Sequence, residues 1–178
     1  MNSELIRKDF PILETKVNGH PVVYFDNGAT TQRPLPVMQA VMDYVIRNNG
    51  NPHRGAHIFA MSASEAYDTS KTVVKDFIGA KSEKEIIYTR NTSESLNLVA
   101  RSYGETHLKE GDRILIPVSE HHSNLVPWQR AAKKTGAVLE YMYVDKETGR
   151  LSEGELKKID DPRVKILAFA QVSNVLGL

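Results

Sequence analysis

The chain has 178 residues, of which 40% are hydrophobic and 25% charged, and its formal net charge is +1. These values are typical of a globular protein with one domain or slightly more, and they exclude disordered, collagen-like and low-complexity classes. The near-neutral charge gives no electrostatic reason to expect a nucleic-acid or membrane partner. No cysteine is present, which excludes disulfides and thiolate chemistry within these residues. Without a signal peptide or an apolar run of about 20 residues, the chain is predicted to be soluble and cytoplasmic.

The first half of the sequence predicts an N-terminal arm followed by two helices. Residues 17–21 carry a turn signal. Apolar residues recur at helical spacing over residues 35–46 and again over residues 63–78, where Gly79 ends the pattern. Between these helices, residues 48–55 are rich in Asn and Gly and predict an irregular loop.

The second half alternates between strands and helices, which favours a parallel sheet with helices on its faces. Strands are predicted at 85–89, 113–118, 137–144 and 164–172, and helices at 92–103, 123–134 and 151–159. Ligands bind such sheets at the carboxyl ends of strands, so the loops after the first, second and last of these strands are the candidate functional loops. Residues 167–170 are predicted to be a buried central strand. Because the sequence stops soon afterwards, we predict a polypeptide cut within its domain.

Two of these loops carry polar side chains that can meet a ligand. Thr92 or Ser93 can cap the helix after the first strand, and hydroxyls beside free N–H groups at a helix start can bind an anion. The alternative is an ordinary N-cap. Asn174, after the last strand, can donate to or accept from a ligand, or it can simply form a turn.

Histidines occur in two further loops. His121 and His122 follow the strand at 113–118, where one of them can act as a general acid or base, stack on an aromatic ring, bind a metal or lie on the surface. Adjacent side chains diverge, so at most one of the pair is expected to face a site. His53 and His57 have a metal-ligand spacing only in a helix, which Gly55 between them disfavours.

Several familiar motifs are absent from the sequence. It contains no G-x-G-x-x-G, no P-loop lysine motif, no G-x-S-x-G and no H-E-x-x-H. These absences argue against the usual forms of nucleotide binding, serine hydrolysis and zincin chemistry.

The order and wording of five segments together resemble one known family. These segments are YFDNGATT at 24–31, PHRG at 52–55, TSE at 92–94, EHHSNLVPWQ at 120–129 and SNVLG at 173–177. They closely resemble the SufS/CsdA-like (group II) cysteine desulfurases, which belong to the class V aminotransferase family of pyridoxal 5′-phosphate (PLP) enzymes. The resemblance runs from residue 6 to the last residue, and the segments at 120–129 and 173–177 are specific to it.

The resemblance implies a fold and a domain organisation. The expected fold is α/β, the aspartate-aminotransferase-like (PLP fold type I) large domain, with a mostly parallel sheet and flanking helices, here incomplete. Residues 1–34 would form an N-terminal arm and the first pocket loop. Residues 35–178 would form the N-terminal part of the PLP-binding large domain, truncated at its C-terminus.

The resemblance also implies an enzyme, a cofactor and partners. The expected reaction converts L-cysteine to L-alanine with PLP as the electron sink. A cysteine thiolate of the enzyme takes the sulfur as a persulfide and passes it to a sulfur-acceptor protein, for iron–sulfur cluster assembly or another use. The full-length protein would be a homodimer.

Site residues follow from the same resemblance. Ser93, with Thr92 beside it, would hold the PLP phosphate, in agreement with the anion site at the helix start. His121 would stack on the pyridine ring and help to move protons. The residues that would bind cofactor or substrate elsewhere are Asn174, Ala29, His53 and Arg54. No metal site is expected.

The sequence departs from the family pattern in three respects. Gly28 stands where the family commonly has Ala, and Asn91 where it has Gly, although Asn can still adopt the positive φ of a tight turn. The Schiff-base lysine, the aspartate facing the pyridine nitrogen, the carboxylate-binding arginine and the sulfur-accepting cysteine would all lie beyond Leu178. The 178 residues alone are therefore expected not to turn over cysteine.

Three alternatives remain open at this point. The first is a selenocysteine lyase or another class V enzyme, because shared motifs do not separate these activities. The second is a non-catalytic, truncated binding subunit, although an exposed apolar terminus argues against it. The third is a metal-binding protein that uses the histidines at positions 53, 57, 121 and 122.

Overall fold

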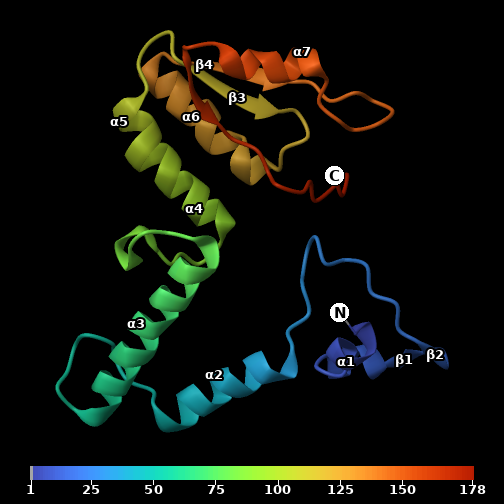
Figure 1. Ribbon diagram of the computed structural model, residues 1–178, viewed down its shortest axis with the longest axis vertical. Helices are drawn as coiled ribbons and strands as arrows, with labels where there is room; N and C mark the ends of the chain where they lie inside the picture. Colours follow the sequence, from blue (N-terminus) through green and yellow to red (C-terminus); the bar gives the residue numbers. More distant parts are fainter. Residues whose placement is uncertain (1) are drawn as a thin grey trace. The chain divides into compact units, whose positions relative to one another are not determined.

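The computed structural model describes residues 2–178, which divide after Tyr88 into two compact units (Figure 1). The first unit contains α1 (Ser3–Arg7), η1 (Pro11–Glu14), β1 (Lys16–Val17), β2 (His20–Pro21), α2 (Leu35–Arg47), α3 (Ile58–Ile78) and η2 (Glu83–Glu85). The second contains α4 (Thr92–Val99), the π-helix η3 (Ala100–Gly104), α5 (Glu105–His107), β3 (Arg113–Pro117), η4 (His122–Asn124), α6 (Val126–Thr135), β4 (Val138–Met142), α7 (Glu153–Leu156), η5 (Lys157–Asp160) and β5 (Val164–Leu167).

In the first unit, local sequence signals set the element boundaries. Strands β1 and β2 form a hairpin whose two turn residues, Asn18 and Gly19, both have positive φ, as a twisted two-residue hairpin requires. The predicted helices correspond to α2 and α3, and α3 ends at Gly79 in the left-handed conformation, with φ 70°. No helix of residues 2–178 has an apolar stretch long enough to cross a bilayer.

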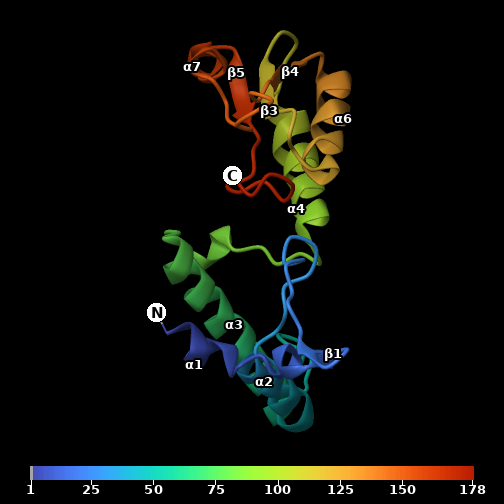
Figure 2. The same cartoon turned by 90° about the vertical axis from the view of Figure 1, so that its right-hand side faces the viewer.

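In the second unit, β3 lies between β4 and β5, and both pairings are parallel. Ile114 is in register with Leu139 on β4 and with Ile166 on β5, so the carboxyl ends of all three strands lie at one edge of the sheet. Figure 2 shows α6 and α7 on opposite sides of this sheet. The predicted α/β class with a parallel sheet and flanking helices is confirmed.

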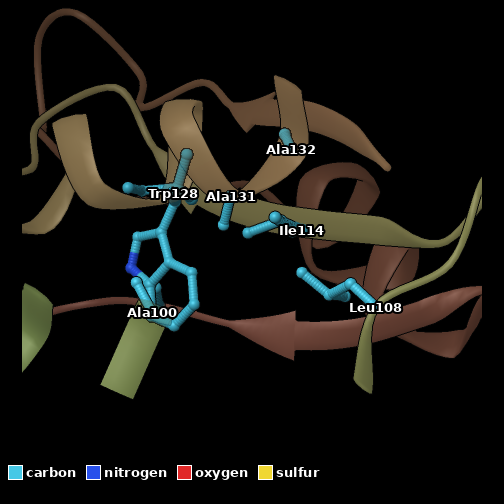
Figure 3. Close-up of a cluster of buried hydrophobic side chains, with 8 residues drawn as sticks. Ala100, Leu108, Ile114, Trp128, Ala131 and Ala132 are labelled. Atoms are coloured by element: carbon cyan, nitrogen blue, oxygen red, sulfur yellow. The ribbon is translucent and has the colours of Figure 1, made fainter. Parts of the chain in front are cut away.

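The core of the second unit forms where α6 covers one face of the sheet. Ile114 and Ile116 lie two residues apart on β3, so both point to this face, and both are fully buried. They pack with Trp128 and Ala131 of α6, and the Trp128 ring extends toward Ala100 at the start of η3 (Figure 3). This packing fixes β3 and α6, and with them the loop that joins the two elements.

Two strand predictions are wrong in detail. Residues 86–89 are extended but pair with no strand of the described chain, and Ile87 is 69% exposed. An apolar, β-branched run becomes a strand only when another strand accepts its backbone hydrogen bonds. The strand expected to be buried and central is β5, which lies at an edge of this sheet and ends at Leu167. Of residues 167–170, only Ala168 is buried.

Candidate functional site

Helix α4 begins at Thr92, as predicted, but its N-cap lies one residue before the residues that the sequence suggested. The N-cap is Asn91, whose Oδ1 accepts the backbone N–H of Glu94 at 2.9 Å, so neither Thr92 nor Ser93 caps the helix. Asn91 has φ −169° and is therefore extended, not in the tight left-handed turn that we considered. The Glu94 carboxylate turns back to accept the Arg90 backbone N–H at 2.7 Å. Together these bonds form a reciprocal cap of the helix start.

This cap leaves the first turn of α4 free. Thr92 and Ser93 become the first two helical residues, whose backbone N–H groups have no intrahelical acceptor. Both side chains are exposed, and within residues 2–178 neither hydroxyl has a hydrogen-bond partner. The hydrogen bonds from Arg90 lower the pKa of Glu94, and the Arg90 guanidinium, 3.2 Å away, offsets its negative charge. The positive end of the helix dipole therefore faces solvent with two hydroxyls beside it.

His121 is the N-cap of η4 and lies four residues after the last residue of β3, Pro117. Its Nδ1 accepts the Ser123 backbone N–H at 3.1 Å and lies 2.8 Å from the Ser123 hydroxyl. A backbone N–H only donates, so the neutral ring carries its proton on Nε2. The ring is exposed, and it lies nearly perpendicular to that of His122, with an interplanar angle of 83°. The two histidines therefore face different directions, as expected for adjacent residues.

Asn174 lies in a closed turn after β5. The turn is held by a backbone bond from the Ser173 N–H to the Leu178 carbonyl at 2.8 Å and another from the Gly177 N–H to the Ser173 carbonyl at 2.9 Å. The Ser173 hydroxyl also accepts the backbone N–H groups of the two residues that follow Asn174. The exposed Asn174 side chain has no hydrogen-bond partner in the described chain, so its amide is available to a ligand.

The structure brings part of the predicted site together within the second unit. Helix α4, which carries Thr92 and Ser93, packs against η4, which follows His121 directly. The loop with His121 and the turn with Asn174 both extend from the carboxyl-end edge of the sheet. A cavity of about 370 Å³ lies at the same edge, lined in part by Pro117, Glu120 and Ser173, but none of the four predicted cofactor residues lines it.

The three remaining predicted residues lie in the first unit. Ala29 is exposed in a turn whose backbone N–H donates to the Asp26 carbonyl at 3.2 Å. His53 has a positive φ of 59°, and its N–H donates to the Ser64 hydroxyl of α3 at 2.8 Å. Arg54 follows it with an exposed side chain. The loop predicted at residues 48–55 is thus held against α3 by the hydrogen bond from His53 to Ser64.

The histidines of this loop have separate partners. His53 Nε2 lies 3.4 Å from the Asp68 carboxylate, whereas His57 is the N-cap of α3 and accepts the Ala60 N–H on Nδ1 at 3.4 Å. They do not form a helical i, i+4 pair, because α3 begins only at Ile58. In the part of the chain that the structure describes, no three metal-ligating side chains come together.

Glu120 is a residue to which the sequence analysis assigned no role. Its Oε2 accepts Asn124 Nδ2–H at 2.9 Å, and its Oε1 accepts the backbone N–H of Ala170 at 2.6 Å. The spacing to Asn124 gave no signal, because Glu120 lies before the helix predicted at 123–134 and the i, i+4 rule applies only within a helix. The bond to Ala170, 50 residues away, had no local signal.

Comparison with known proteins gives the family. Residues 23–178 match the model of the Aminotransferase class-V family. The chain is 46% identical to a probable cysteine desulfurase from Synechocystis sp. over 97% of its own length, and 46% identical to another from Halalkalibacterium halodurans over 99%. It spans only 41% and 43% of the lengths of these relatives.

Solved structures agree with this assignment. The apo cysteine desulfurase of Thermococcus onnurineus matches all of this chain with a TM-score of 0.86 and 42% identity, and the chain covers 42% of it. The cysteine desulfurase CsdA of Escherichia coli matches with a TM-score of 0.79 and 34% identity, and the chain covers 43% of it. The family match covers most of the sequence, and the chain belongs to the class-V aminotransferases.

Proposed function

We propose that these residues form the phosphate- and ring-binding part of a PLP-dependent cysteine desulfurase of the SufS/CsdA-like type. The observation that carries the proposal is the free first turn of α4, with the unpartnered hydroxyls of Thr92 and Ser93, next to the turn that carries His121. The names of the relatives support L-cysteine as substrate. L-Alanine and a persulfide for a sulfur-acceptor protein in iron–sulfur cluster assembly would be the products.

The residues present fit PLP. A phosphate monoester needs N–H and O–H donors, and the α4 start offers two backbone N–H groups, two hydroxyls and the positive end of a helix dipole. A flat aromatic ring can stack on an exposed imidazole, and His121 offers one. When bound, PLP supplies an electron sink for the substrate amino acid.

The side chains of this unit have separate tasks in the proposal. Thr92 and Ser93 hold the phosphate and so fix one end of the cofactor. His121 covers the ring, and the proton on Nε2 is the one that it can donate, because Nδ1 is engaged by Ser123. Asn174 binds a cofactor or substrate oxygen through its free amide. In the first unit, Ala29, His53 and Arg54 are proposed to line the substrate pocket.

The proposed reaction needs residues outside these 178. The sequence has no cysteine, so the persulfide would form on a thiol from another segment of polypeptide. We propose that residues 1–34 serve as an arm and first pocket loop and that the complete enzyme is a cytoplasmic homodimer. The 178 residues alone should bind PLP and release neither alanine nor sulfide from cysteine.

Phosphate recognition is the first test. We expect Ser93→Ala to weaken PLP binding about tenfold, because a hydrogen bond to a charged group is lost. Pyridoxal without the phosphate should bind wild type and variant equally weakly. Ser102→Ala is the matched control, since Ser102 is exposed and its hydroxyl bonds only to the Leu98 carbonyl. Equal PLP affinity of Ser93→Ala and wild type would contradict the proposed phosphate site.

Activity needs a complete enzyme. Residues 1–178 can replace the matching part of the Synechocystis relative, and the chimera can be assayed for alanine and sulfide from L-cysteine, with the relative as positive control. We expect activity in the chimera and a large loss in its His121→Ala variant. A folded chimera that prefers selenocysteine, or that acts on neither substrate, would refute the proposed cysteine specificity.

A further inference from the structure

A series of three hydrogen bonds joins the loop that carries His121 to the segment that follows β5. Trp128 Nε1–H donates to Asn124 Oδ1 at 3.1 Å, and Asn124 Nδ2–H donates to Glu120 Oε2 at 2.9 Å. The Ala170 backbone N–H donates to Glu120 Oε1 at 2.6 Å. We call this series the Glu120 link.

The end of the link formed by Trp128 and Asn124 is buried. Trp128 is 3% exposed within the core cluster (Figure 3). Asn124 is 8% exposed. An indole N–H can only donate, so it fixes the Asn124 amide with its oxygen toward Trp128 and its NH₂ toward Glu120. The Ala170 N–H also only donates. Glu120 therefore faces two donors, and only an acceptor on each oxygen satisfies both of them.

We propose that Glu120 is a positioning residue that holds the His121 loop and the Asn174 turn at a fixed separation. Its backbone is joined directly to His121, and its side chain holds the backbone four residues before Asn174. This inference rests on the proposed function, in which both side chains meet the same cofactor. The link supplies a tertiary constraint beyond the β3–β5 pairing, because within residues 2–178 no side-chain hydrogen bond of His121 or Asn174 joins one loop to the other.

Each hydrogen bond of the link has a fixed donor and acceptor. Swapping the carboxylate and the amide between positions 120 and 124 is therefore the decisive test. Glu120→Gln places an amide NH₂ against one of the two donors, the NH₂ of Asn124 or the Ala170 N–H, and Asn124→Asp places a carboxylate oxygen against Glu120. Either single change breaks one bond of the link. In the double variant, the new amide at position 120 donates to the new carboxylate at position 124, which still accepts from Trp128. All three bonds and the total charge are then restored, with only the middle bond reversed.

Amide hydrogen exchange tests the link without any cofactor. The sequence has a single Trp, so the indole N–H gives one NMR signal. We expect both single variants to exchange about tenfold faster at the Ala170 N–H and the indole, because repulsion at the broken bond displaces the two side chains that accept from these groups. Exchange should rise with them at the Asn124 N–H, which donates to the His121 carbonyl, and at the Gly177 N–H, which closes the Asn174 turn. The double variant should return toward wild type, and the exposed control Glu147→Gln should change nothing.

PLP affinity tests the positioning role. We expect each single variant to bind PLP about tenfold more weakly and the double variant to regain affinity, while Ser93→Ala weakens binding without changing the indole signal. If a single variant does not fold and the double variant does, that rescue supports the link.

Three outcomes overturn the inference. They are unchanged exchange at Ala170 in Glu120→Gln, a double variant no better than the worse single variant, and unchanged PLP affinity once the link is broken. A wild-type chain that does not bind PLP would instead contradict the proposed function, and the exchange at the Asn124 and Gly177 N–H groups would still decide whether Glu120 holds the two loops.

Discussion

The contact between η3 and α6 predicts that Gly104→Ala destabilises the second unit. Gly104 ends the π-helix and is buried against α6. A Cβ at this position would lie 3.2 Å from Cζ3 of Trp128 and 3.7 Å from Cβ of Ala131. The Trp128 ring is held in position, because it is buried and its Nε1–H donates to Asn124. The added methyl group therefore has to displace the ring or the helix.

The expected cost follows from two opposing effects. Overpacking a well-packed core costs about 1–3 kcal/mol. Replacing Gly by Ala in a helical conformation returns about 1 kcal/mol. The net loss in the free energy of unfolding should be about 1 kcal/mol, which lowers the Tm by roughly 4–8 °C for a unit of this size. Because the displaced ring also anchors Asn124, the indole signal of Trp128 should shift in this variant.

Gly154→Ala is the matched control in the same unit. Gly154 lies in the first turn of α7, where a Cβ would meet only the Ser152 hydroxyl, at 3.7 Å. The same chemical change there should stabilise by about 0.5–1 kcal/mol, since only the helix propensity changes. Urea unfolding followed by Trp128 fluorescence measures both variants. A Gly104→Ala protein as stable as wild type, beside a stabilised Gly154→Ala, would refute the packing argument.

Two further predictions concern the first unit and the acid stability. Gly50→Ala would drive a Cβ into the Phe59 carbonyl group, so we expect a loss of about 1–3 kcal/mol, measured by circular dichroism during urea unfolding. Unchanged stability would contradict that close approach. Hydrogen bonds from the Arg163 side chain and backbone hold the pKa of Asp161 well below its usual value. The contribution of this carboxylate to the free energy of unfolding is therefore complete above about pH 4 and is lost as the pH falls further. Asp161→Asn should remove that loss and flatten the acid side of a plot of stability against pH. An equally steep acid limb in the variant would contradict the assignment.

Local signals in the sequence were sufficient for much of the fold. The apolar period over residues 35–46 corresponds to α2, and Gly79 ends α3 where the sequence indicated. Strand β3 is recognisable because all its residues after Arg113 are apolar, as a strand covered on both faces requires. Each of these features depends on residues within one or two turns of one another. The pairing of residues 86–89 depends on a distant strand and was therefore predicted wrongly.

The site was predicted less completely for a related reason. Asn91, Thr92 and Ser93 are three consecutive residues that can all cap a helix, and a pattern does not tell which of them takes the cap. The structure assigns it to Asn91, which is what leaves the next two free. Glu120 had no assigned role because one of its two partners, Ala170, is a backbone group 50 residues away.

In each of these loops, a residue that anchors the backbone lies beside a residue proposed for chemistry. Asn91 holds the α4 start while Thr92 is free, Glu120 is bonded on both oxygens while the His121 ring is exposed, and Ser173 closes a turn while the amide of its neighbour is free. Adjacent side chains point in different directions, so one can hold a distant segment of the backbone while its neighbour faces solvent. A polar pair in such a loop is therefore best interpreted as one anchor and one ligand. Mutating the anchor should alter the geometry of binding, whereas mutating its neighbour should remove the contact itself.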